Sequence, residues 1–206
     1  MTFHASAILF DLDGTLVDST VSVIHHWRLF AERNGLELND ILAISHGRRT
    51  EETIRMLAPH LDAAAEAARH NRAETEETEG TREVAGAAAL LASIPAERWT
   101  IVTSCPRPLA EARLRAAGLP VPERMVTSEE VTAGKPDPAC YLLGAERLGF
   151  AAERCVVFED APAGVAAGRA AGMAVVTVGE TVADLRAVRV HGEAESDLKI
   201  VIQSAV

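Results

Sequence analysis

The sequence predicts an α/β protein, in which a doubly wound parallel sheet carries an inserted helical domain. From about Thr81 onward, apolar strand-like runs alternate with helical patterns, and this alternation favours a parallel sheet. The run Ala7–Phe10 near the start is continuously apolar, as in a strand that is covered on both faces. Between these parts the pattern is helical. We therefore expect a core of residues 1–16 and 82–206 and a helical domain of residues 17–81.

The inserted segment predicts a small bundle of helices. Apolar side chains recur at helical spacing over residues 23–31, and Gly35 is placed to end that helix. Two shorter helices are expected over residues 39–44 and 50–58. Asp62 is placed to cap an alanine-rich helix that follows them.

The remaining core pattern alternates regularly between helix and strand. The predicted strands cover residues 99–103, 124–127, 155–159 and 174–178. The predicted helices cover residues 84–93, 108–117, 138–148 and 163–171. Glycines directly after three of these helices, at positions 118, 149 and 172, are suitable C-terminal caps.

Composition limits the class of partner. The 206 residues, 48% of them hydrophobic, are enough to bury a full core. The 20 basic and 30 acidic residues give a net charge of −10, which disfavours a nucleic-acid partner. Residues 1–7 lack the features of a signal peptide, and no apolar run approaches the ~20 residues of a membrane span. We expect a cytoplasmic protein with no membrane or nucleic-acid partner.

Four polar motifs lie at predicted strand ends or before a helix, where ligands of parallel sheets bind. They are Asp11 with Asp13, Thr103-Ser104, Lys135, and Glu159-Asp160. In this order they resemble the haloacid dehalogenase superfamily, over nearly the whole chain. The resemblance implies a Rossmann-like core, and it implies that the helical insertion is a cap domain that closes over the substrate.

The acids of this site favour a metal ion on physical grounds. Carboxylates crowded at one sheet edge repel one another unless a cation is present. Oxygen ligands that act together with a phosphate favour Mg²⁺. The resemblance implies that Mg²⁺ is held by Asp11, by the Asp13 main-chain carbonyl and by Asp160, while Glu159 acts through water.

The resemblance also implies a role for each residue in phosphoryl transfer. Asp11 is the expected nucleophile and forms an aspartyl-phosphate, while Asp13 protonates the leaving alcohol and later activates water. Lys135 adds a positive charge between nucleophile and phosphate. Thr103 and the Ser104 main-chain N–H are expected to bind the phosphate. These roles describe a magnesium-dependent phosphatase.

The loop Ser45-His46-Gly47-Arg48-Arg49-Thr50 connects two predicted cap helices. Together with residues 158–164, it is similar to the glycerol-3-phosphatase and 2-deoxyglucose-6-phosphatase group, whose loop has the pattern Ser-His-Gly-x-Arg-Thr. This similarity implies a small sugar or polyol phosphate as substrate. His46 and Arg49 are the candidate substrate-binding residues, and a purely structural turn is the alternative. His25 and His26 point about 100° apart on one helix, and we expect both to be solvated.

Three other functions share parts of this motif pattern. A sugar-phosphate mutase of the β-phosphoglucomutase type would carry a histidine twelve residues after the nucleophile, where this chain has Val23. A dehalogenase of the superfamily would lack the second aspartate. A non-catalytic phosphate-binding regulatory protein would usually have lost the nucleophile or the lysine, and this chain keeps both. We expect a small phosphorylated metabolite as partner, and a monomer or small homo-oligomer.

Overall fold

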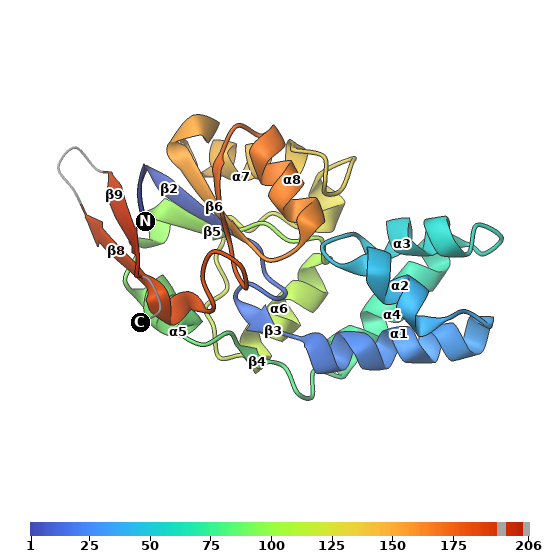
Figure 1. The fold of residues 1–206 in the computed structure, drawn as a ribbon. Coiled ribbons are helices and arrows are strands. Elements are labelled where there is room, and N and C mark those ends of the chain that lie inside the picture. The colour runs from blue at the N-terminus through green and yellow to red at the C-terminus, as the bar shows by residue number, and fades with distance from the viewer. Residues whose placement is uncertain (193–196, 204–206) are drawn as a thin grey trace.

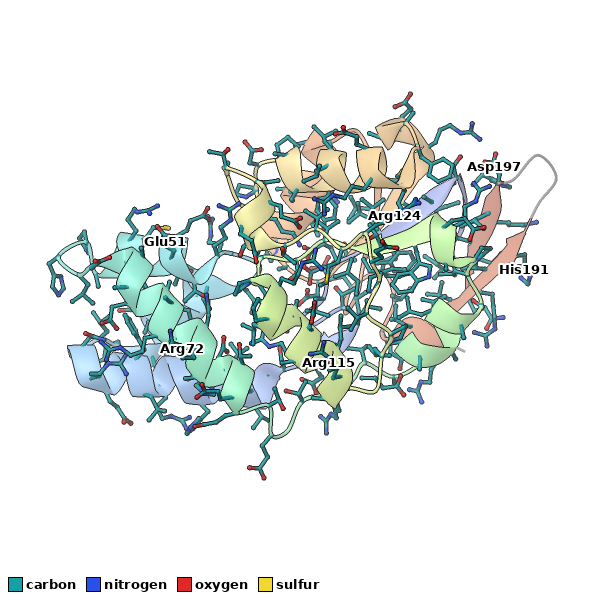
Figure 2. All side chains as sticks on the ribbon, turned by 180° about the vertical axis from the view of Figure 1, so that it is seen from behind. Glu51, Arg72, Arg115, Arg124, His191 and Asp197 are labelled. Atoms are coloured by element: carbon teal, nitrogen blue, oxygen red, sulfur yellow. The ribbon has the colours of Figure 1, made fainter. Side chains whose placement is uncertain are left out.

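The computed structural model describes residues 1–192 and 197–203. An α/β core lies on one side of the molecule and a bundle of helices on the other (Figure 1). His191 and Asp197 lie at the end of the core far from the bundle, which carries Glu51 and Arg72 (Figure 2). No helix in the described ranges is both long enough and apolar enough to cross a membrane. The predicted fold class is confirmed.

A parallel sheet with the order β5-β2-β6-β7 forms the centre of the core. Its strands are β2 (Ala7–Phe10), β5 (Trp99–Ile101), β6 (Cys155–Glu159) and β7 (Ala174–Thr177). The helices around it are α5 (Ala87–Ala92), α6 (Arg107–Ala116), α7 (Ala139–Leu148) and α8 (Pro162–Ala170). Ile8 and Phe10 pack in one apolar cluster with α5 and α6, and Ala7 and Leu9 pack in another with α7 and α8. This two-sided burial explains why β2 is continuously apolar.

The strand predicted over residues 124–127 is wrong, because it forms only one isolated bridge. That bridge joins Val102 to Val126. Thr127 ends the extended segment, since its N–H and hydroxyl both donate to Glu130 in a capping box. A short 3₁₀ turn over Ser128–Glu130 begins there.

Two antiparallel sheets that the sequence did not predict flank the core. The first has the order β1-β9-β8, with β1 (Thr2–Ala5), β8 (Val188–Gly192) and β9 (Leu198–Ile202). The second pairs β3 (Val17–Asp18) with β4 (Arg82–Glu83). The chain enters the helical bundle after β3 and returns through β4, so the two connections lie side by side. The domain limits at 16/17 and 81/82 stay a prediction.

The helical bundle has an apolar core of its own, built around Trp27, Phe30, Ile41 and Ile54. Its helices are α1 (Thr20–Asn34), α2 (Leu38–Ser45), α3 (Thr50–Leu57) and α4 (Ala63–Glu76). The predicted helix ends are confirmed in two places. Gly35 ends α1 in the left-handed conformation, and Asp62 caps α4 by accepting a hydrogen bond from the Ala65 N–H at 3.1 Å.

His26 differs from its prediction, because it is buried. Only 4% of its surface is exposed, and its ring lies edge-on to His70 of α4, with 6.1 Å between centroids. His25 remains half-exposed. The packing of α4 against α1 covers one of these adjacent side chains and leaves the other in solvent.

Candidate active site

Asp11 follows β2 at the edge of the sheet and contacts a buried lysine. The Lys135 ammonium donates to Asp11 Oδ1 at 2.5 Å, to Glu159 Oε1 at 2.7 Å and to the Val102 carbonyl at 3.1 Å. Burial opposes the charge on Lys135, but Asp11 and Glu159 outweigh it and hold the pKa of the lysine well above its usual value. Burial raises the pKa of Asp11 well above its usual value, and Lys135 opposes that shift. Lys135 therefore stays charged beside the carboxylate.

The acids that follow β2 and β6 come together at this edge. Asp11, Glu159 and Asp160 offer carboxylate oxygens that lie within 4.8 Å of one another. The Thr15 hydroxyl donates to Asp160 Oδ1 at 3.4 Å. Gly14 has a φ of +86°, and a Cβ at that position would lie 2.0 Å from Asp160 Oδ2. Only glycine leaves room for Asp160 here.

Glu159 already has protein donors around its carboxylate. Besides Lys135, the Tyr141 hydroxyl donates to Oε1 at 3.1 Å and the Ala161 N–H donates to Oε2 at 2.8 Å. The side chain is fully buried. Glu159 therefore fixes the position of Lys135.

The Asp13 carboxylate is not part of the acid cluster and has three donors. The Ser19 hydroxyl donates to Oδ1 at 2.7 Å, while the Cys105 thiol (3.1 Å) and Arg113 Nη1 (2.8 Å) donate to Oδ2. Sequence reasoning missed these three partners. Arg113 lies on α6, where its spacing resembles that of any basic residue on a surface helix, so the sequence gives no signal for its role.

The Thr103-Ser104 loop that follows β5 contacts the cap loop. Thr103 is buried, and its hydroxyl accepts from the Cys105 N–H at 3.1 Å. The Ser104 hydroxyl donates to the Gly47 carbonyl at 2.8 Å. The cap is therefore closed onto the core.

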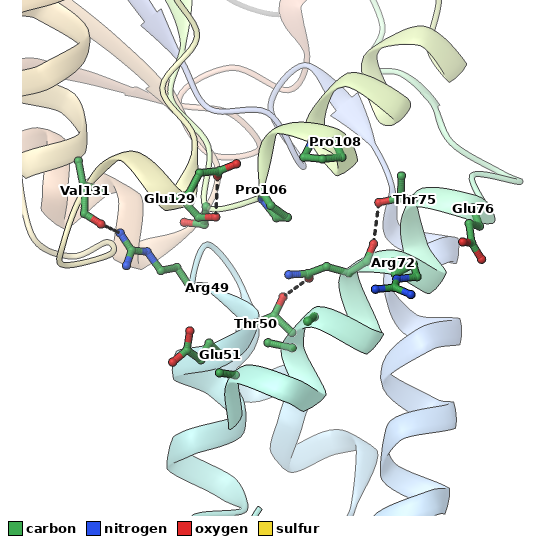
Figure 3. Close-up of a pocket in the computed structure, with 16 residues that line it drawn as sticks. Arg49, Thr50, Glu51, Arg72, Thr75, Glu76, Pro106, Pro108, Glu129 and Val131 are labelled. Atoms are coloured by element: carbon green, nitrogen blue, oxygen red, sulfur yellow. Dashed lines mark hydrogen bonds between the residues drawn. The ribbon is translucent and has the colours of Figure 1, made fainter. Parts of the chain in front are cut away.

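A cavity of about 220 Å³ lies between the core and the closed cap. Asp11, Asp13 and Ser104 line it from the core, and Val23, His46 and Arg48 are among the cap residues that line it. A second, more open cavity of about 640 Å³ adjoins it and shares Thr50 and Ser104 (Figure 3). Asp11 and Asp13 line the smaller cavity and not the larger one, so the smaller cavity is the candidate catalytic cavity.

The cap loop sends its side chains in different directions. His46 Nε2 lies 3.3 Å from Asp160 Oδ2, and this hydrogen bond raises the pKa of His46. Arg49 donates to the Val131 carbonyl at 2.7 Å (Figure 3) and to the Thr132 carbonyl at 3.1 Å. The Arg48 side chain lines the smaller cavity and makes no hydrogen bond or ion pair with any other described residue, while its main-chain N–H donates to the Ser45 carbonyl at 3.0 Å. Sequence reasoning singled out Arg49 and passed over Arg48.

The haloacid dehalogenase-like hydrolase family matches residues 5–172 of the chain. The chain belongs to this family. Hexitol phosphatase A of Escherichia coli (strain K12) is 49% identical to this hydrolase over 183 residues, which are 85% of this chain and 83% of that protein. Glycerol-1-phosphate phosphohydrolase 2 of Saccharomyces cerevisiae (strain ATCC 204508 / S288c) is 34% identical over 194 residues, 88% of this chain and 77% of that protein.

Solved structures agree with this membership. A hydrolase from Pseudomonas syringae superposes on this chain with a TM-score of 0.75 and 27% identity, over 84% of this chain and 83% of that one. The predicted family is confirmed by the sequence relatives and by the fold.

Proposed function

We propose that this hydrolase is a magnesium-dependent phosphatase, which acts on a small sugar or polyol phosphate through an aspartyl-phosphate on Asp11. The observation that carries the proposal is Asp11 at the sheet edge, 2.5 Å from the Lys135 ammonium, with Asp13 in the same cavity. The names of the relatives, a hexitol phosphatase and a glycerol-1-phosphate phosphohydrolase, support the substrate class. Hexitol and glycerol phosphates are both phosphate monoesters of a polyhydroxy chain.

The donor set fits a hard divalent cation. Asp11, Glu159 and Asp160 bring three carboxylates within 4.8 Å, and Lys135 offsets one negative charge. Oxygen-only donors suit Mg²⁺. We expect Asp11, the Asp13 main-chain carbonyl and Asp160 to hold it, because the Glu159 oxygens already accept from protein donors. Bound Mg²⁺ would neutralise charge on the phosphate oxygens.

The side chains divide the reaction between them. The Asp11 oxygen attacks phosphorus, and the bond from phosphorus to the alcohol oxygen breaks. Asp13 gives that oxygen a proton and then takes one from the water that attacks phosphorus and frees Asp11. Lys135 orients Asp11 and balances charge on the phosphoryl group. Thr103 and the Ser104 N–H bind phosphoryl oxygens.

The alcohol part of the substrate lies under the cap loop. His46 and Arg48 both line the cavity there, and the Arg48 guanidinium has no hydrogen-bond partner among the described residues. Substrate binding by Arg49 stays a prediction, and its bonds to two core carbonyls favour a role in holding the cap closed. Val23 lines the cavity at the position where a mutase would carry histidine, which supports hydrolysis over phosphoryl transfer to a second sugar.

The test is phosphate release from hexitol, glycerol and aryl phosphates, measured with Mg²⁺ and then with excess chelator. We expect release to stop with chelator, and Asp11→Asn to abolish it. Asp184→Asn is the matched control, because Asp184 is a partly exposed carboxylate that pairs with Arg186 and does not line the cavity. Release that survives chelation would remove Mg²⁺ from the proposal, and an active Asp11→Asn would show that another residue is the nucleophile. Isomerisation of a sugar phosphate without phosphate release would identify a mutase.

A further inference from the structure

One buried guanidinium joins the cap to the proposed acid of the core. Arg113 of α6 is 3% exposed, and its two terminal nitrogens have different partners. Nη1 donates to Asp13 Oδ2 at 2.8 Å, and Nη2 donates to Glu74 Oε1 at 2.9 Å. Asp13 belongs to the core, whereas Glu74 lies on cap helix α4. The two carboxylates are thus linked through one side chain.

Besides Arg113, Glu74 has little around it that could balance its negative charge. It is 4% exposed, and its second oxygen lies 3.6 Å from His70 Nε2. A buried carboxylate without a cation is strongly unfavourable. Because Glu74 lies on cap helix α4 and Arg113 on core helix α6, this contact requires the closed cap, and it also gives the second guanidinium nitrogen of Arg113 a partner.

The other Asp13 oxygen depends on the cap as well. Oδ1 accepts from the hydroxyl of Ser19 at 2.7 Å, and Ser19 directly precedes α1, the first cap helix. A guanidinium is a rigid planar fork, so a partner on one nitrogen fixes the direction of the other nitrogen. Movement of the cap would release Glu74 from Arg113 and displace Ser19 together.

We propose that Arg113 is a positioning residue, which with Glu74 orients Asp13 for proton transfer only when the cap is closed. The proposal rests on the proposed role of Asp13. Its consequence is that the protonating group is set in place by the same movement that encloses the substrate. In an open enzyme only the core donors Cys105 and Arg113 would remain on Asp13, without the alignment that Glu74 and Ser19 add.

Two substrates separate this role from a general effect on binding. An alkyl phosphate without further hydroxyls, such as propyl phosphate, needs its leaving oxygen protonated, whereas an aryl phosphate with a weakly basic leaving group does not. The value of kcat/KM reports the steps up to transfer of the phosphoryl group to Asp11, before water is activated. Misplacement of Asp13 therefore lowers kcat/KM selectively for the alkyl phosphate.

The experiment compares Glu74→Gln, Arg113→Lys and the double variant with Glu66→Gln. Glu66 is the matched control, because it lies on the same helix and its ion pairs with Arg33 and Arg69 stay within the cap. We expect Glu74→Gln and Arg113→Lys to lower kcat/KM roughly ten- to a hundredfold for the alkyl phosphate and less than about threefold for the aryl phosphate. The double variant should resemble the worse single variant, because both act through one contact.

Equal losses on both substrates, or a Glu74→Gln that behaves like Glu66→Gln, would overturn the proposal. If Arg113→Lys fails to fold, Glu74→Gln and Ser19→Ala decide the matter, since Ser19→Ala removes the other Asp13 donor without a change of charge. Failure of the proposed function would look different, because the unmodified protein would then release no phosphate from either substrate.

Discussion

Gly134 lies where the cap meets the loop that carries Lys135. The Gly134 N–H donates to Glu52 Oε1 at 3.1 Å, and a Cβ at this position would lie 2.7 Å from that oxygen and 2.9 Å from Arg49 Nε. The backbone of Gly134 does not have a left-handed φ, so alanine would not strain the chain itself. Gly134→Ala therefore acts on the contact between cap and core.

The size of the effect follows from the bonds at this contact. Arg49 donates to the carbonyls of Val131 and Thr132, and Glu52 accepts from Gly134. Hydrogen bonds to charged groups contribute about 1.5–3 kcal/mol each. The Arg49 and Glu52 side chains are 16% and 26% exposed, so water replaces part of what is lost. After this discount, loss of one bond should disfavour closure by about 1 kcal/mol, roughly fivefold.

The assay is kcat/KM for a hexitol phosphate and for an aryl phosphate. Gly134→Ala should lower both by a similar factor, since closure serves every substrate, and Arg49→Ala should do the same. Gly192→Ala is the control, because a Cβ there has no atom of the described residues within 4 Å. Full activity of Gly134→Ala would show that the cap and the loop that carries Lys135 do not need to pack this closely. A loss confined to the hexitol phosphate in Arg49→Ala would restore Arg49 as a substrate-binding residue.

Three further predictions follow from single side chains. Arg48→Ala should lower kcat/KM for a hexitol phosphate about tenfold and kcat/KM for an aryl phosphate much less, because the Arg48 side chain lines the cavity and can donate to substrate hydroxyls. Equal losses on both substrates would argue against recognition of hydroxyls by Arg48. Tyr141→Phe removes a donor to buried Glu159 and should lower the free energy of unfolding by about 1–2 kcal/mol in urea titrations, whereas an unchanged value would mean that the hydroxyl is dispensable. Burial lowers the pKa of His70 to about 3, against about 6.5 in the unfolded chain. The unfolded state therefore binds the extra proton, and stability is lost as pH falls below about 6.5, by at most about 1.4 kcal/mol per pH unit. Urea unfolding at pH 7 and pH 5 should show that His70→Gln loses less of its free energy of unfolding between these pH values than the unmodified protein does. An identical loss in both proteins would contradict a buried neutral imidazole at His70.

Local pattern along the chain is sufficient to predict the parallel sheet and the acidic edge of the site. The apolar run before Asp11 and the alternation after residue 81 are properties of neighbouring residues, and they predict the strands and the helices that cover them. The ends of parallel strands meet at one edge whatever the details of packing. Asp11 and Asp160 can therefore be placed together from their positions in the sequence, and their carboxylates do lie together.

Contacts between the cap and the core depend on tertiary packing, which no local sequence pattern predicts. Glu74 and Arg113 are 39 positions apart on helices of different parts of the chain, and the rotation of those helices against each other follows from the whole interface. Arg48 and Arg49 are neighbours, yet one lines the catalytic cavity and the other bonds to core carbonyls. The strand β1 finds its partner β9 near the other end of the chain. Local sequence sets the periodicity of an element, but the direction of each side chain depends on what packs against it.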